Sequence, residues 1–166
     1  MAVRSRTATV TLPTDEQILI TREFDAPREL VYKAFTTPEL VKRWWHANRG
    51  EVKIAEIDLR VGGKWRYVSV ATGGFEVAFH GEYLEIVPNE RIVSTEIYEG
   101  LPEGVSEEEG RTVNTTTFTE ADGRTTLTIL VQATSKMSRD AIIDSGMEAG
   151  LQDALDLLQQ AALSLR

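Results

Sequence analysis

The stretch Ser138-RDAIIDSGMEAGLQDALDLLQQAALS-Leu165 lies at the C-terminal end of the sequence and decides how the rest must fold. Its apolar residues recur at steps of three and four, which places them on one stripe of an α-helix. They are Ile143, Met147, Leu151, Leu155, Leu158, Ala162 and Leu165. A continuous helix of about 27 residues would extend for about 40 Å. Such a helix cannot bury its stripe alone, so a broad apolar surface must face it.

Nearly everything before this stretch alternates with the period of two that is typical of β-strands. Two short helices interrupt the pattern after Phe24: Asp25 is the expected N-cap of the first, and Thr37-Pro38 begins the second. The expected strands cover 7–12, 17–24, 52–59, 64–70, 75–86, 92–98, 111–119 and 125–134. The step from Ile54 to Ile57 breaks the alternation and predicts a bulge, and Gly81 in mid-strand predicts a bend or a close backbone approach.

Short turns join the later strands, so consecutive strands must run antiparallel. About six strands follow the two short helices, and one long helix follows the strands. The sequence therefore predicts an α+β fold in which a curved antiparallel sheet wraps around the C-terminal helix.

Composition narrows the class of protein. The chain has 166 residues, 42% of them hydrophobic and 27% charged, which suits a globular domain with a real core. It has no cysteine, no apolar run long enough to span a bilayer and no apparent signal peptide, so we expect a cytoplasmic protein without membrane insertion. A formal net charge of −8 argues against nucleic-acid binding, which requires a basic surface. Five glutamates between Glu99 and Glu109 are expected to form a solvated acidic loop.

Several motifs together resemble one known family. They are Phe24-DAPRELVYKAFTTPE-Leu40 followed by Trp44-Trp45, then Asp58-LRVG-Gly63, Gly81-EYLEIV-Pro88, Glu90-RI-Val93 and Ser145-Gly-Met147. In order and spacing they are similar to the START/Bet v 1-like (SRPBCC) superfamily, and more closely to its branch of activator of Hsp90 ATPase homologue 1-like proteins. The resemblance covers about residues 8–165. It implies a helix-grip fold forming one domain over 1–166, with residues 1–6 as a flexible tail.

The resemblance does not fix a function, because the superfamily includes lipid carriers, hormone receptors, polyketide cyclases and co-chaperone domains. We favour binding of an apolar or amphipathic small molecule in a cavity between the sheet and the C-terminal helix. The expected wall residues are Trp44, Trp65, Tyr67, Phe79, Met147 and Leu151. Of the adjacent Trp44 and Trp45, one is expected in the core and the other near its rim, because neighbouring helical residues point about 100° apart.

The first alternative is an enzyme of the polyketide cyclase or dehydratase type. It would require polar groups inside the cavity, for which His80, Tyr67 and Glu82 are the candidates. The sequence contains no recognisable catalytic motif, and its histidines, His46 and His80, lack the partners of a metal site. We therefore assign no catalytic residue, metal or cofactor. Asp58 and Arg60 are expected to form a structural pair beside the Gly62-Gly63 turn.

The second alternative is a stress-related co-chaperone or protein-interaction module. The co-chaperones that give the family its name carry an additional N-terminal domain, for which this sequence has no room, so Hsp90 is not the expected partner. The strand over 7–12 can pair with its own sheet or with a second copy, which leaves a homodimer open.

Overall fold

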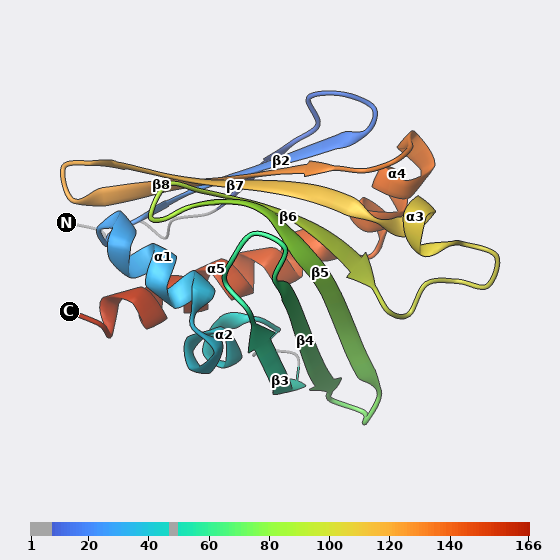
Figure 1. The fold of residues 1–166 in the computed structure, drawn as a ribbon, viewed down its shortest axis with the longest axis horizontal. Coiled ribbons are helices and arrows are strands. Elements are labelled where there is room, and N and C mark those ends of the chain that lie inside the picture. Colours follow the sequence, from blue (N-terminus) through green and yellow to red (C-terminus); the bar gives the residue numbers. More distant parts are fainter. Residues whose placement is uncertain (1–7, 47–49) are drawn as a thin grey trace.

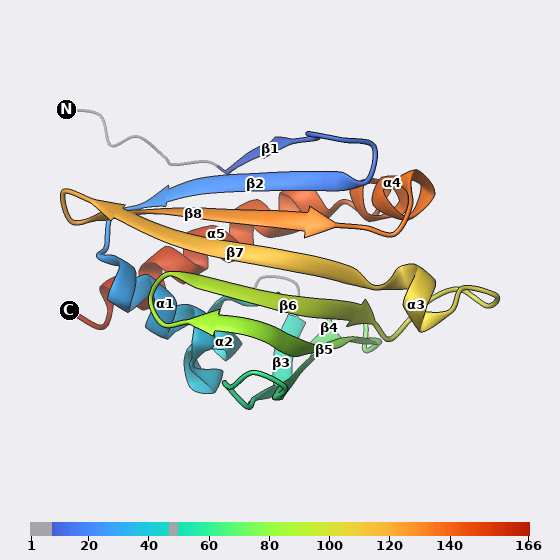
Figure 2. The same ribbon diagram turned by 45° about the horizontal axis from the view of Figure 1, so that its top comes forward.

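The computed structural model describes residues 8–46 and 50–166 and shows an eight-stranded antiparallel sheet curved around helices (Figures 1 and 2). The expected tail over 1–6 lies outside this range. The strands are β1 (Thr9–Thr11), β2 (Gln17–Phe24), β3 (Gly50–Ile57), β4 (Lys64–Ala71), β5 (Glu76–Val87), β6 (Arg91–Tyr98), β7 (Thr112–Ala121) and β8 (Arg124–Gln132). The helices are α1 (Arg28–Thr36), α2 (Pro38–Trp44), α3 (Glu107–Gly110), α4 (Lys136–Asp144) and α5 (Met147–Leu163).

The strands lie in the order β1-β2-β8-β7-β6-β5-β4-β3, so the chain returns at its end to pair β8 with β2. The N-terminal arm pairs with its own sheet, since β1 runs antiparallel to β2. Helix α5 crosses the concave side of the sheet, and α1 and α2 lie beside its C-terminal half (Figures 1 and 2). This arrangement confirms the predicted α+β helix-grip fold.

The predicted single helix over 138–165 is wrong in one respect, because the chain breaks it between α4 and α5. Gly146 takes a φ of 83°, in the left-handed region where glycine is favoured. Ser135 is the N-cap of α4, and its side chain accepts a hydrogen bond from the Ser138 amide. Helix α5 keeps 17 residues, which corresponds to about 25 Å. The break tilts α4 to one end of the sheet and leaves α5 alone to fill the concave side.

Three local predictions also need correction. Asp25 does not cap α1: Pro27 occupies the N-cap position, and Asp25 forms an ion pair with Arg124 at 3.3 Å. The bulge in β3 falls between Val52 and Ile54, earlier than the expected step from 54 to 57. The glutamates of the acidic loop are exposed, as expected, but the loop also contains a short helix, α3, whose Ser106 and Glu109 form a capping box.

The core lies between the concave face and the C-terminal half of α5. Leu155, Leu158, Ala161 and Ala162 of α5 are buried against large side chains of the sheet, among them Phe24, Phe118 and Leu127. One charge is buried with them. Arg22 on β2 is only 3% exposed, and its guanidinium reaches the Asp156 carboxylate on α5 at 2.9 Å. Burying an arginine is tolerable only with such a partner, so this pair fixes α5 against the sheet.

Candidate functional site

The concave face carries an aromatic wall built from β4 and β5. Trp65 and Tyr67 are inward-facing neighbours on β4, with ring centroids 4.8 Å apart. Phe79 lies directly opposite Tyr67 on β5, and its ring lies 5.1 Å from that of Tyr98 on β6. Trp45, just after α2, covers both strands, with centroid distances of 5.3 Å to Tyr67 and 5.8 Å to Phe79. These contacts join the strands and α2 into one apolar surface.

Gly81 makes the wall possible. The hydrogen-bond ladder between β5 and β6 is open between the pairs His80–Ile97 and Tyr83–Ser94. The Trp65 indole N–H fills the opening and donates to the Thr95 carbonyl at 3.2 Å. A Cβ atom at position 81 would lie 1.8 Å from that carbonyl oxygen, so no larger residue fits. The predicted close backbone approach is therefore confirmed.

Helix α5 faces the wall unevenly. The core-facing residues of its C-terminal half are buried, whereas Met147, Leu151 and Ala154 in its N-terminal half are only half-buried. On the concave face of the sheet, Phe79 and Ile129 are also half-buried. An apolar face that packs tightly against a helix loses nearly all its exposure. The packing between sheet and helix is therefore looser toward the α4–α5 junction.

The two tryptophans of the Trp44-Trp45 pair divide as the sequence indicates. Trp44 is 6% exposed, stacks on Phe35 at 5.4 Å and donates its indole N–H to the Ala34 carbonyl at 2.9 Å. These are contacts of a core residue, so the assignment of Trp44 to ligand binding stays a prediction. Trp45 is the residue whose ring lies on the aromatic wall.

Polar groups gather on the same concave face beside the wall. Ser94 and Glu96 on β6 pair in register with Asn114 and Thr112 on β7, and alternation places all four on the face of buried Ile92. We call these four residues the inner polar patch. The Asn114 side-chain amide donates to the Glu96 carboxylate at 3.4 Å. The patch lies toward the end of β6 and the beginning of β7. Helix α5 starts beneath the same end of the sheet (Figures 1 and 2).

Burial dominates the electrostatics of this face. It raises the pKa of Glu96, because the charged carboxylate is poorly solvated, although Asn114 lowers it in part. Burial also raises the pKa of Tyr67 well above its usual value, and the nearby Tyr83 and Glu96 add to the effect. The tyrosine hydroxyls therefore stay protonated and act as hydrogen-bonding groups.

Sequence reasoning missed Glu96 and Asn114. A signal was present, because Glu96 shares the inward alternation of Ile92 and Ser94 along β6, and a charged residue at such a position is unusual.

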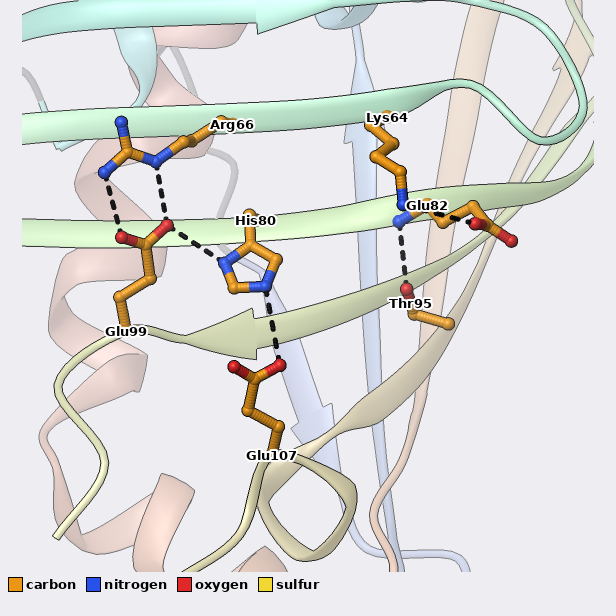
Figure 3. Close-up of polar contacts among 7 residues, drawn as sticks. All are labelled: Lys64, Arg66, His80, Glu82, Thr95, Glu99 and Glu107. Carbon is orange, nitrogen blue, oxygen red and sulfur yellow. Dashed lines mark hydrogen bonds and ion pairs between the residues drawn. The ribbon is translucent and has the colours of Figure 1, made fainter.

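The outer face of the sheet carries a separate charged groove of about 770 Å³. Figure 3 shows the polar contacts among charged side chains in and beside it. Arg66 donates two hydrogen bonds of 2.9 Å to Glu99, and His80 Nδ1 lies 2.9 Å from the same carboxylate. The His80 Nε2 atom lies 3.9 Å from Glu107 of α3. Hydrogen bonds from Arg66, and then His80, lower the pKa of Glu99 to about 2.

This geometry separates the three residues of the cyclase alternative. His80 and Glu82 lie on the outer face, where Glu82 pairs with Lys64 at 3.7 Å (Figure 3). Tyr67 belongs to the aromatic wall on the concave side. His80 is oriented by Glu99 and Glu107, not by Glu82. The set therefore cannot act on one substrate.

Other candidate positions are structural. Arg60 donates to Asp58 at 2.8 Å, as expected, and both side chains are exposed. The following turn is held by hydrogen bonds in both directions between Tyr83 and the Gly62-Gly63 backbone. Within residues 8–46 and 50–166, no three His, Asp or Glu side chains come close enough to hold a metal ion.

A curved antiparallel sheet that grips a C-terminal helix, with an aromatic concave face, defines the helix-grip class of the START/Bet v 1-like superfamily, a fold that commonly binds hydrophobic ligands. Within this class the chain belongs to the family described as activator of Hsp90 ATPase homolog 1-like proteins, which matches residues 25–162.

Solved structures agree with this assignment at the level of fold. A Rhodobacter sphaeroides protein is similar with a TM-score of 0.85 and 22% identity, covering 95% of this chain and 99% of its own. An Arthrobacter aurescens protein has a TM-score of 0.81 and 21% identity, with coverages of 94% and 91%. A Chromobacterium violaceum protein is 29% identical with a TM-score of 0.67, with coverages of 87% and 95%. No functionally curated protein sequence matches the chain. No helix in the described ranges is long and apolar enough to cross a membrane.

Proposed function

We propose that this protein binds an apolar or amphipathic small molecule between the aromatic wall and the N-terminal half of α5. The observation that carries the proposal is the uneven burial of α5: the core-facing residues of its C-terminal half are buried, whereas Met147 and Leu151 stay half-buried, as does Phe79 on the concave face of the sheet. When a ligand covers apolar side chains that are partly exposed on a concave surface, the complex is stabilised by about 25 cal/mol per Å² of apolar surface removed from water.

The wall suits an adaptable binding surface. Trp65, Tyr67 and Trp45 offer large apolar area on rigid side chains, which lose little conformational entropy on binding. Met147 adds a flexible, polarisable side chain that accommodates different ligand shapes. Phe79, Leu151 and Trp44 complete the proposed set.

Filling the proposed space from the helix side tests this function. Met147→Trp places a large ring between α5 and the wall, and Met137→Trp makes the same exchange on α4, where the side chain is 82% exposed. The probe is N-phenyl-1-naphthylamine, followed by its fluorescence, and urea unfolding reports stability.

We expect the wild-type protein and Met137→Trp to bind the probe equally. Met147→Trp should bind it at least about tenfold more weakly while its unfolding free energy falls by less than about 1 kcal/mol, because the ring occupies space that the ligand would fill. Loss of binding and stability in equal measure would place Met147 in a packed core and contradict the proposal. Native mass spectrometry without any bound mass, together with no probe binding by the wild-type protein, would refute it and favour the protein-interaction alternative.

A further inference from the structure

The inner polar patch contains more hydrogen-bond acceptors than the protein satisfies. The side-chain oxygens Thr112 Oγ1 and Asn114 Oδ1 are both buried and have no hydrogen-bond partner among the described residues. Thr112 is only 3% exposed. Leaving such groups unpaired costs about 1–3 kcal/mol each, so a buried polar pair of this kind requires an explanation.

Glu96 adds two carboxylate oxygens to the same place. Its contact with the Asn114 amide uses one of them, at the long distance of 3.4 Å. In the part of the chain that the structure describes, no Lys or Arg side chain contributes to the electrostatics of this carboxylate. The side-chain nitrogen of Asn114 donates to Glu96, so the side-chain oxygen of Asn114 remains an acceptor without a partner among the described residues.

The position of the patch links it to the aromatic wall. Glu96 lies close enough to Tyr67 for the two groups to interact electrostatically. Ser94, the neighbour of Glu96 on the inner face, pairs with Tyr83 of β5. The patch and the wall therefore form one continuous concave surface, apolar over β4 and β5 and rich in acceptors over β6 and β7.

We propose that the ligand is an amphipathic molecule with a hydrogen-bond-donating end, a hydroxyl or an amino group, which binds Glu96, Asn114 and Thr112 while its apolar body lies along the aromatic wall. This inference rests on the proposed function and adds the chemical class of the ligand. A donor pairs with the unsatisfied oxygens of Asn114 and Thr112 and with the Glu96 carboxylate, whereas a carboxylate end would face Glu96 with like charge.

A series of naphthalenes that differ only in one substituent tests the inference. The probes are naphthalen-2-ylmethanol, its methyl ether, naphthalen-2-ylmethylamine and 2-naphthoate, titrated by calorimetry into the wild-type protein. The alcohol or the amine should bind at least about tenfold more tightly than the ether, and the naphthoate should bind most weakly, because a hydrogen bond to a charged group is worth about one power of ten or more. The tighter of the two donors identifies the class of ligand end.

Two variants locate the effect. Glu96→Leu and Asn114→Leu should each reduce the preference for the donor over the ether at least about threefold. Glu82→Leu, which removes a carboxylate from the outer face of the same sheet, should leave it unchanged. The preference is the ratio of the affinities for the donor probe and for the ether, both measured on the same protein sample. A partly misfolded sample lowers both affinities alike, so it does not change this ratio. If one inner variant fails to fold, the other and the wild-type series still decide.

The outcomes separate the two proposals. If all four naphthalenes bind with the same affinity, the inference about the donor is overturned while the proposed function stands. A preference that survives in both Glu96→Leu and Asn114→Leu likewise overturns it. If none of the four binds and N-phenyl-1-naphthylamine does not bind either, the proposed function itself has failed.

Discussion

Replacing Gly81 with alanine tests the opening between β5 and β6 that supports the aromatic wall. The new Cβ atom would lie 1.8 Å from the Thr95 carbonyl oxygen and 2.6 Å from Trp65 Nε1. An ordinary contact requires about 3.4 Å, so β5 and β6 must separate locally by about 1.6 Å, the difference between the two distances. Such a shift breaks the buried hydrogen bond between Trp65 and Thr95.

Two costs add in this variant. An unsatisfied buried indole N–H costs about 1–3 kcal/mol, and overpacking costs a similar amount. We therefore expect Gly81→Ala to lower the free energy of unfolding by about 3 kcal/mol or more, measured by urea denaturation with tryptophan fluorescence.

Gly104→Ala is the matched control. A Cβ atom at position 104 meets nothing, but its φ of +88° carries backbone strain, so this variant should lose about 1 kcal/mol from strain alone. Trp65→Phe separates the hydrogen bond from the clash, because it removes the indole N–H and keeps an aromatic ring. A loss below about 1 kcal/mol for Gly81→Ala would refute the reasoning that this opening is rigid.

Three further predictions follow from burial and charge. Glu96→Gln should raise stability at neutral pH, because burial raises the pKa of the Glu96 carboxyl in the folded state above its value in the unfolded state. The native protein therefore loses stability as the pH rises from the unfolded pKa through the folded pKa. Thermal melts from pH 4 to 8 should show this decrease in the wild-type protein and not in the variant. Glu99→Gln should act in the opposite sense and lower stability by about 1 kcal/mol at pH 6. The loss should shrink as the pH falls from the usual carboxyl pKa through the folded pKa of about 2, because Glu99 then becomes protonated in the native state, and a pH profile parallel to that of the wild-type protein would contradict this. Leu158→Ala should cost about 2–5 kcal/mol in urea denaturation, because Leu158 is 0% exposed, whereas Leu84→Ala at 44% exposure should change stability little.

Much of the inner surface could be predicted from alternation along single strands. Trp65 and Tyr67 fall on one face of β4, and Phe79 and Tyr83 on one face of β5, because side chains in a strand alternate strictly unless a bulge intervenes. Register shifts lie in β3 and, after Tyr83, in β5, so the assignments up to Tyr83 stay intact. The helical stripe from Leu155 to Ala162 was equally readable from its spacing.

The partners of charged residues could not be predicted in this way. His80 and Glu82 share a face of β5, which suggested a pair, but the structure gives His80 the distant Glu99 and Glu107. Glu96 and Asn114 meet across two strands, and their pairing depends on the register between β6 and β7. Register is set by long-range pairing, which a local pattern does not record.

The sequence by itself determined the class of fold, the order of elements and the inward side of β4 and β5, because these depend on local periodicity and on turn residues. Only the tertiary structure decided that Trp45 rather than Trp44 joins the aromatic wall, that α5 packs tightly along one half only, and that Glu96, Thr112 and Asn114 form one acceptor-rich patch. These features depend on where the curved sheet and the helix meet and separate, which is fixed by the strand register and by the break at Gly146 together.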